Sequence, residues 1–222
     1  MDIGGSDDCR MKFRLFKISF EISVPFAVMI AFLLIMDKTG LMTASLFAAT
    51  LHESGHMAAM KISGCAPGSV KCCPAGILIT GNAYKTAADS AFIAVSGPAA
   101  NFAAAILLLL IGRVTDSVTA YAFAAVQLIV GAVNMLPVKG LDGGTLMLIL
   151  LRSLKLRSPE FVFSFISLFT AVGSVVAGAA VAVKNTSNPS LLLLGVYLVV
   201  LNIMRRWVFR KSIYVELSVV NK

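Results

Sequence analysis

The feature that most constrains this chain is a series of long apolar runs that leave little sequence between them. Hydrophobic residues make up 58% of the 222 residues, whereas soluble domains contain roughly 45–50%. Runs of about 18 or more apolar residues are typical of helices that cross a lipid bilayer. We therefore expect one polytopic membrane domain over residues 1–222, with no appended soluble domain.

The apolar runs predict six transmembrane helices. A seventh stretch, 142–151, is too short to cross a bilayer alone. It follows a segment containing Pro137 and Gly140, which should interrupt a helix, so we interpret 118–151 as one broken span around a polar site. The six expected spans cover residues 19–36, 41–60, 88–112, 118–136, 160–183 and 190–204.

The longest link between spans, 61–87, is too apolar for an ordinary cytosolic loop. Within it, the segment from Val70 to Tyr84 predicts two short extended pieces around Pro74. We expect a membrane-associated β-hairpin here, with a simple surface hairpin as the alternative. The predicted fold class is an all-α polytopic membrane protein with about six transmembrane helices, one of them broken, and this small β-hairpin.

The formal charge of +8 raises the question of nucleic-acid binding. We exclude it, because the Lys and Arg residues lie at the ends of apolar runs, where they follow the positive-inside rule. With six crossings and both termini cytosolic, fifteen of the nineteen basic residues fall on the cytosolic side. The basic N-terminal stretch resembles a signal sequence, but no cleavage site of small residues follows, so we expect an uncleaved first span. Of the other four basic residues, three fall on the external side and one lies in the break. They are Lys38, Arg113 and Lys184, and Lys139, respectively.

The motif that carries chemistry is His52-Glu53-Ser54-Gly55-His56, an H-E-x-x-H pattern inside the second expected span. Residues i and i+4 share one face of a helix, so both imidazoles can reach one metal ion. Glu53 follows the first ligand, where its carboxylate can act as general base towards the attacking water. With two His and four Glu in the chain, chance would give this pattern about three times in ten thousand. A polar cluster that holds helices together is the alternative.

A zinc hydrolase normally uses three protein ligands and leaves one position open. The chain has no third His, and most acidic residues near the apolar runs lie at span ends. Asp142, in the broken region and followed by Gly143-Gly144, is the best candidate by elimination. It could instead cap the helix that follows it. Soft thiolate ligands remain alternatives, from Cys65, Cys72 and Cys73, which we otherwise expect to be reduced.

Two motifs together resemble the site-2 protease family of intramembrane metallopeptidases. They are the H-E-x-x-H motif and the segment Asn134-x-x-Pro137-x-x-x-Leu141-Asp142-Gly143-Gly144. The segment Ser96-Gly97-Pro98-Ala99-Ala100-Asn101 also looks like this family. The chain departs from many relatives, which have proline in place of Gly140 and a basic residue in place of Thr145.

The resemblance implies a three-helix catalytic core at about 41–152, with accessory helices at 19–36 and 160–204. It implies one zinc ion per chain, held by His52, His56 and Asp142, and cleavage in or near a transmembrane segment of a substrate. By position, Asn134 matches a family asparagine that holds substrate or the developing oxyanion, although bonding to the broken backbone is an equal alternative.

The resemblance also indicates a partner and a location. The partner is a single-span or membrane-associated protein, with a membrane regulator as a further partner. By analogy with compact bacterial members, the substrate would be the membrane-bound precursor of a sporulation sigma factor. The location would be a bacterial cell membrane, with the active site reached from the cytosolic side. A membrane metal transporter and an inactive membrane scaffold are the alternative functions.

Overall fold

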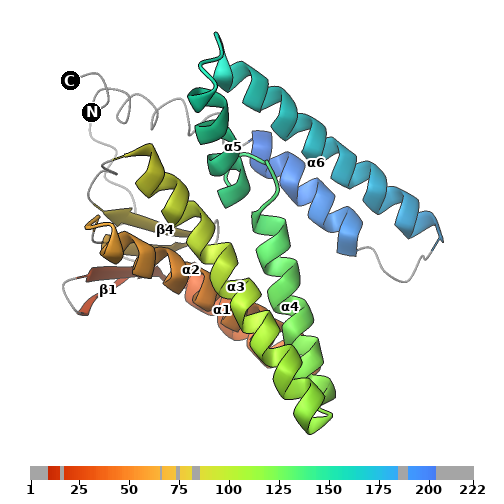
Figure 1. Cartoon of the computed structure of the whole chain (residues 1–222). Helices are drawn as coiled ribbons and strands as arrows, with labels where there is room; N and C mark the ends of the chain where they lie inside the picture. The colour runs from red at the N-terminus through yellow and green to blue at the C-terminus, as the bar shows by residue number, and fades with distance from the viewer. Residues whose placement is uncertain are drawn as a thin grey trace, which may run out of the picture.

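The computed structural model describes residues 10–15, 18–65, 67–73, 76–81, 86–184 and 190–203, and it is mostly helical with one small sheet (Figure 1). In chain order, the elements are β1 (Arg10–Leu15), β2 (Ile18–Ser23), α1 (Val24–Met36), α2 (Leu41–Ile62), β3 (Pro67–Cys73), β4 (Gly76–Gly81), α3 (Ala87–Thr115), α4 (Val118–Asn134), α5 (Asp142–Ser153), α6 (Pro159–Lys184) and the unnumbered helix Ser190–Ile203.

Helices α2, α3 and α4 pack against one another and form the centre of the fold. Their contacts are made largely by small side chains such as Ala48, Ala105 and Ala124, which are fully buried. Small residues let helix backbones approach closely, which is how helices associate inside membranes. Large apolar side chains instead face outward, among them Leu110 and Ile129. An apolar exterior around a small-residue interior is the arrangement that lipid surroundings favour.

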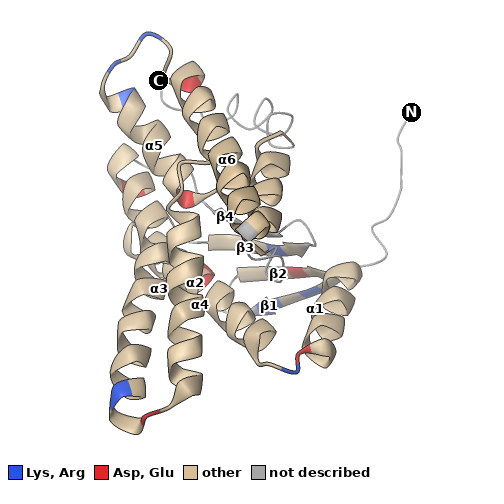
Figure 2. Cartoon of the chain, turned by 90° about the vertical axis from the view of Figure 1, so that its right-hand side faces the viewer, with Lys and Arg blue, Asp and Glu red and all other residues tan. Residues whose placement is uncertain are grey.

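Among the described residues, two helices, α3 and α6, are long and apolar enough to cross a membrane by length and composition. Helices α1, α4 and Ser190–Ile203 are apolar but shorter, with 10–17 residues each. The predicted helices at 88–112, 118–136 and 160–183 are thus present with shifts of a few residues, while the six crossings remain a prediction. Figure 2 shows Lys and Arg at the α3–α4 turn, at the α5–α6 turn and on the sheet.

The sheet is larger than the predicted hairpin. In the part of the chain that the structure describes, it has four strands in the order β1-β2-β3-β4. The predicted extended pieces around Pro74 correspond to β3 and β4, which pair antiparallel, whereas β2 joins β3 in parallel. The end of the predicted hairpin, residues 82–84, lies outside the described residues.

The prediction of a first transmembrane helix over 19–36 is wrong for residues 19–23, which belong to β2. This segment alternates apolar and polar residues, a period that suits a strand. Helix α1 therefore has only 13 residues, or about 20 Å, against the roughly 30 Å of a bilayer's hydrocarbon core.

The turn between α1 and α2 is held by Asp37. Its Oδ2 accepts hydrogen bonds from the backbone N–H and the hydroxyl of Thr43, each at 2.9 Å, in the first turn of α2. The bond from the Thr43 backbone N–H is the main reason why the pKa of Asp37 is lowered to about 2. This carboxylate thus fixes the start of the helix that carries the H-E-x-x-H motif.

The predicted break between residues 118 and 151 is present. Helix α4 ends at Asn134 and α5 begins at Asp142, with a non-helical segment between them. Helix α5 packs against α3 on one side and α6 on the other, as Figure 1 shows. The break therefore brings the start of α5 back towards the α2–α3–α4 group.

Candidate metal centre

Helix α2 presents both histidines to the same side. His52 and His56 lie one turn apart, so their side chains share a face, and their ring centroids are 4.7 Å apart. His52 is buried and His56 is partly buried. The helix thus supplies two imidazoles to one point inside the fold, as the motif predicts.

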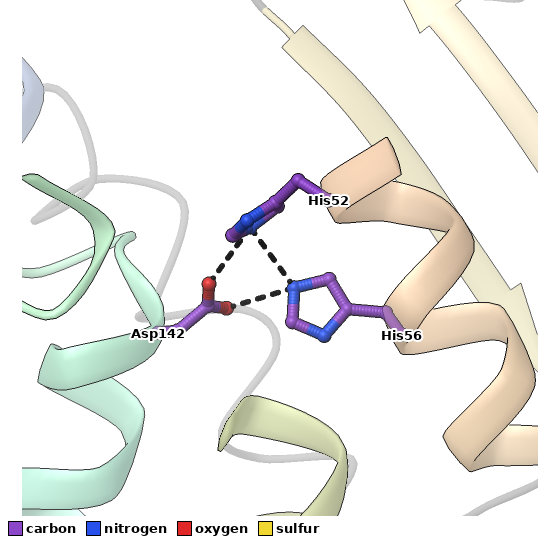
Figure 3. A group of neighbouring side chains, drawn as sticks. All are labelled: His52, His56 and Asp142. Carbon is purple, nitrogen blue, oxygen red and sulfur yellow. Dashed lines mark hydrogen bonds and ion pairs between the residues drawn. The ribbon is translucent and has the colours of Figure 1, made fainter. Parts of the chain in front are cut away.

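Asp142, the first residue of α5, completes a triangle with the two imidazoles (Figure 3). The two Nε2 atoms are 3.1 Å apart. Asp142 Oδ2 lies 2.9 Å from Nε2 of His52, and Asp142 Oδ1 lies 3.3 Å from Nε2 of His56. Within the described part of the chain, this is the one group of three His, Cys, Asp or Glu side chains close enough to share a metal ion.

Hydrogen bonds on the far side of each ring set its orientation. His52 Nδ1 lies 2.7 Å from Oδ1 of Asn101, and His56 Nδ1 lies 2.7 Å from the carbonyl oxygen of Ile93. An oxygen acceptor at Nδ1 holds the proton of a neutral ring there, so the lone pair is on Nε2. Both lone pairs consequently face the Asp142 carboxylate and each other, which favours a cation between them.

The orientation of the Asn101 amide is fixed by its other partners. Its Nδ2 donates to the carbonyl oxygen of Ala48 at 3.0 Å and to Oε1 of Gln127 at 2.6 Å. Its Oδ1 is therefore the atom that meets His52. Asn101 and Gln127 are almost fully buried, so a polar chain runs from the metal centre through α3 to α4.

The spacing of the three side chains fits a small divalent cation. Zinc binds His nitrogen and carboxylate oxygen at about 2.0–2.2 Å, and tetrahedral geometry then separates ligand atoms by roughly 3.3–3.5 Å. The observed separations of 2.9–3.3 Å are slightly shorter. Asp142 Oδ2 is buried and makes no aligned hydrogen bond despite its closeness to His52. A metal ion would satisfy this oxygen, and three ligands would leave a fourth position open.

Gly97 of α3 makes room for the imidazoles. A Cβ atom at this position would lie 2.4 Å from Nε2 of His56 and 2.9 Å from Cε1 of His52. Both contacts are shorter than any side chain tolerates. Similarly, a Cβ atom at Gly55 would lie 2.6 Å from the carbonyl oxygen of Ser96. These two glycines allow α3 to pass directly beside the motif.

The glycines after Asp142 allow the break to fold back on α5. A Cβ atom at Gly143 would lie 2.0 Å from the carbonyl oxygen of Met135, and one at Gly144 would lie 2.2 Å from that of Val138. Gly140 has a φ of 93°, which proline, fixed near about −65°, cannot adopt. A proline at position 140, which many relatives have, would thus require a different backbone path through the break.

Among the other predicted site residues, Glu53 is partly buried on α2, directly after His52 and three residues before His56. The amide nitrogen of Asn134 donates to the carbonyl oxygen of Val130 in its own helix. Val130 belongs to α4 and not to the break, so this bond is not the one to the broken backbone that was expected.

The structure does not favour the alternatives to Asp142 as the third ligand. Asp142 is not the N-cap of α5, because Leu141 occupies that position. The buried Cys65 and the partly buried Cys72 lie outside the metal-ligand group, and the side chain of Cys73 lies outside the described atoms. The structure thus brings Asp142, and neither Cys65 nor Cys72, to the two histidines.

No role was predicted from the sequence for Asn101, Gln127 or Gly97. Two of them, Gly97 and Asn101, could have been singled out as functional candidates, because they belong to the segment that resembles the family. Gln127 is a polar residue in an otherwise apolar helix, and such residues are costly inside a membrane unless they bond to a partner. The pairing between these residues depends on helix packing and could not be read from their positions.

Replacing Asn101 by Leu is expected to weaken metal binding about 10-fold, because the hydrogen-bond partners of ligating histidines typically contribute roughly 10–100-fold in metal affinity. Without Oδ1 of Asn101, the ring of His52 can rotate or move its proton to Nε2. A competition titration with a chromophoric chelator on detergent-purified protein measures the affinity. Asn134→Leu is the matched control and should retain affinity. Equal affinities for Asn101→Leu and the wild type would show that His52 does not depend on this hydrogen bond.

Comparison with known proteins supports the resemblance at the level of the fold. No family model matches the chain, and no curated protein matches it in sequence. Among solved structures, the chain is similar to the site-2 protease from Methanocaldococcus jannaschii, with a TM-score of 0.57 and 20% sequence identity. The match covers 88% of this chain and 94% of that one. The resemblance to site-2 proteases is therefore confirmed in the fold, over nearly the whole chain.

Proposed function

We propose that this chain, which has the fold of a site-2 protease, is an intramembrane zinc metalloprotease. The observation that carries the proposal is the convergence of His52, His56 and Asp142 on one point, with Glu53 beside the first ligand. The apolar exterior of the surrounding helices supports a membrane location. The proposed catalytic core is residues 41–152, with the remaining helices as accessory elements of a single domain.

The three ligands would hold the metal ion, and Glu53 would act as general base. Bound zinc supplies Lewis-acid polarisation of the scissile carbonyl and makes a water molecule more acidic. Glu53 would take a proton from the attacking water, because it directly follows the ligand His52 on α2. Asn101 and the carbonyl oxygen of Ile93 keep the two rings oriented.

The proposed reaction is hydrolysis of a peptide bond. The water oxygen forms a bond to the carbonyl carbon, and its proton passes to Glu53. Glu53 then gives this proton to the nitrogen as the C–N bond breaks, which releases a carboxylic acid and an amine. The second water proton leaves the acid for the amine or for solvent, so that a carboxylate remains. Asn134 remains a candidate for holding substrate or the oxyanion, provided its side chain leaves Val130.

Substrate must present an unwound backbone, because a helix hides its amides in internal hydrogen bonds. Strand addition to the sheet is a suitable way to hold such a segment. Strand β3 is already paired on both sides, by β2 and β4. In the part of the sheet that the structure describes, β4 is an edge strand next to β3. We propose the outer edge of β4 as the docking edge.

The proposed substrate is a single-span or membrane-associated protein, with a sporulation sigma-factor precursor suggested by analogy alone. A membrane regulator would be a further partner. Co-expression with candidate single-span proteins, followed by immunoblotting for a shortened product, tests this proposal. Absence of a shortened product with every candidate, together with metal transport into vesicles, would favour the transporter instead.

The proposed topology places both termini and the access to the active site on the cytosolic side. Reporter domains fused after Lys85 and after Lys155 are expected to be cytosolic, whereas one fused at Thr115 is expected to be external. The reason is the concentration of Lys and Arg in the segments assigned to the cytosol. Activity of a paired alkaline-phosphatase and fluorescent-protein reporter measures each position, and a cytosolic signal at Thr115 would overturn the orientation.

A further inference from the structure

The two histidines and Asp142 belong to different packing groups. His52 and His56 are supported by α3 and α4, through Asn101, Ile93 and Gln127. Asp142 follows the non-helical segment that ends α4, and its helix packs partly on α6. The position of this carboxylate therefore depends on what holds the segment before it.

One buried hydroxyl joins that segment to two later helices. Ser167 of α6 accepts a hydrogen bond from the backbone N–H of Lys139 at 2.9 Å and one from Nδ2 of Asn202 at 2.5 Å. Ser167 and Asn202 are almost fully buried. Inside an apolar environment, losing a partner leaves a buried donor unsatisfied, which is energetically unfavourable. The Ser167 hydroxyl thus holds the backbone at Lys139, three residues before Asp142.

Apolar packing surrounds this attachment point. Val138 of the break, Ala171 of α6 and Leu198 of the later helix form a fully buried cluster. Leu136 and Leu141, on either side of the Lys139 backbone, pack against it. The break is thereby held by both hydrogen bonds and apolar contacts to the same two helices.

The two helices themselves form a close pair, which we call the C-terminal pair (α6 and Ser190–Ile203). A Cβ atom at Gly178 would lie 2.6 Å from Cα of Leu192, and one at Gly195 would lie 2.7 Å from the backbone nitrogen of Val175. Such close backbone contact makes the two helices move together. The pair can therefore act as one rigid support.

Further contacts fix the pair to the same region. Lys139 Nζ donates to the hydroxyl of Ser164 at 2.7 Å. The ring of Phe163 lies 3.2 Å from the position that a Cβ atom of Gly144 would occupy. At the other end of α5, Arg152 and Glu160 form an ion pair at 3.2 Å. The C-terminal pair thus contacts α5 near its start and at its end.

We propose that the C-terminal pair is a positioning element for Asp142, and that Ser167 is its main positioning residue. This inference rests on the proposed metal site, but not on proteolysis. Ser167 touches neither metal nor substrate. It acts by fixing the Lys139 backbone, and so the direction in which the Asp142 carboxylate enters the site.

Ser167→Ala is expected to weaken zinc affinity about 10-fold. This lies within the range of losses in metal affinity seen when residues that orient metal ligands are replaced. Competition titration with a chromophoric chelator in detergent measures the affinity. Cobalt substitution gives a second readout, since the intensity of the cobalt absorption bands follows ligand geometry. These bands should weaken in Ser167→Ala, because the carboxylate is less well placed.

Ser174→Ala is the matched control. Ser174 lies two turns further along α6 and donates to the carbonyl oxygen of Thr170 in its own helix. It should retain wild-type zinc affinity and cobalt bands. A merely structural role of Ser167 would lower the melting temperature of Ser167→Ala and leave zinc affinity and cobalt bands unchanged, and this result would overturn the proposal.

Asn202→Leu tests the same point if Ser167→Ala does not fold. It removes one of the two bonds to Ser167 and keeps a side chain of similar size, so a reduction of about 3-fold in zinc affinity is expected. The double variant should lose no more affinity than Ser167→Ala, because both act through one hydroxyl. Wild-type affinity in Asn202→Leu would contradict the proposal. Failure of the wild type to bind zinc would overturn the metal site as well.

Discussion

Glu53→Gln is expected to abolish peptide bond cleavage while leaving the protein folded, membrane-inserted and zinc-loaded. Glutamine has nearly the same shape and can still form hydrogen bonds, but it cannot take a proton from water. General base catalysis contributes on the order of 10²–10⁴ in rate, so little or no product should accumulate. Immunoblotting of a co-expressed single-span substrate measures cleavage, and zinc analysis of the purified variant measures loading.

The matched control is Asp116→Asn, which removes an exposed carboxylate at the C-cap of α3. This variant should cleave as the wild type does. A transporter or scaffold would hardly respond to Glu53→Gln, because no metal ligand is lost. Equal cleavage by Glu53→Gln and the wild type would mean that another residue is the base.

His52→Ala, His56→Ala and Asp142→Ala are each expected to lower zinc affinity by roughly 100-fold or more. Each removes one of three ligands, whose combined binding free energy is large in zinc sites. A remaining histidine cannot move to restore the geometry, because its partner on α3 holds its ring in place. Zinc content after size-exclusion chromatography, measured by mass spectrometry, checks this expectation.

Cys65→Ser and Cys72→Ser are the controls for the ligand assignment and should keep full zinc content. Their sulfur atoms lie outside the group formed by the histidines and Asp142. If Asp142→Asn retained full zinc while a substitution of Cys65, Cys72 or Cys73 lost it, the third ligand would be a thiolate.

The central part of the site was accessible from sequence because it depends on local geometry. Residues four apart on a helix share a face, so His52 and His56 had to converge if α2 formed. Asp142 was reached by elimination, since few acidic residues lie away from span ends. The glycines at 143 and 144 suggested close backbone approach, and their partners are the carbonyl groups of the break itself.

The N-terminal strands show where the sequence analysis went wrong. Arg10–Leu15 and Ile18–Ser23 both alternate polar and apolar residues, and Phe13 stacks on Phe20 across the pair. This period of two predicts strands, whereas the basic residues before an apolar run favoured a first transmembrane helix. The parallel pairing of β2 with β3, from residues about 50 apart, depends on tertiary packing and has no local signal.

The residues that orient the metal ligands could not be predicted from the sequence, for a related reason. Asn101, Gln127 and Ser167 are polar residues within apolar helices, and the linear sequence does not distinguish them from the other polar residues of the same helices. What separates them is the partner that the packing brings: an imidazole for Asn101 and a backbone N–H for Ser167. A sequence can mark such residues as costly in a membrane, but helix packing decides their role.

The central claim is most directly tested with purified protein in proteoliposomes that also contain a single-span substrate. Removing metal with a chelator should stop cleavage, and adding one equivalent of zinc should restore it in the wild type but not in Glu53→Gln. Mass spectrometry of the products should place the cut in or near the transmembrane segment. Cleavage that persists in the metal-free protein, or that Glu53→Gln performs at the wild-type rate, would contradict the account.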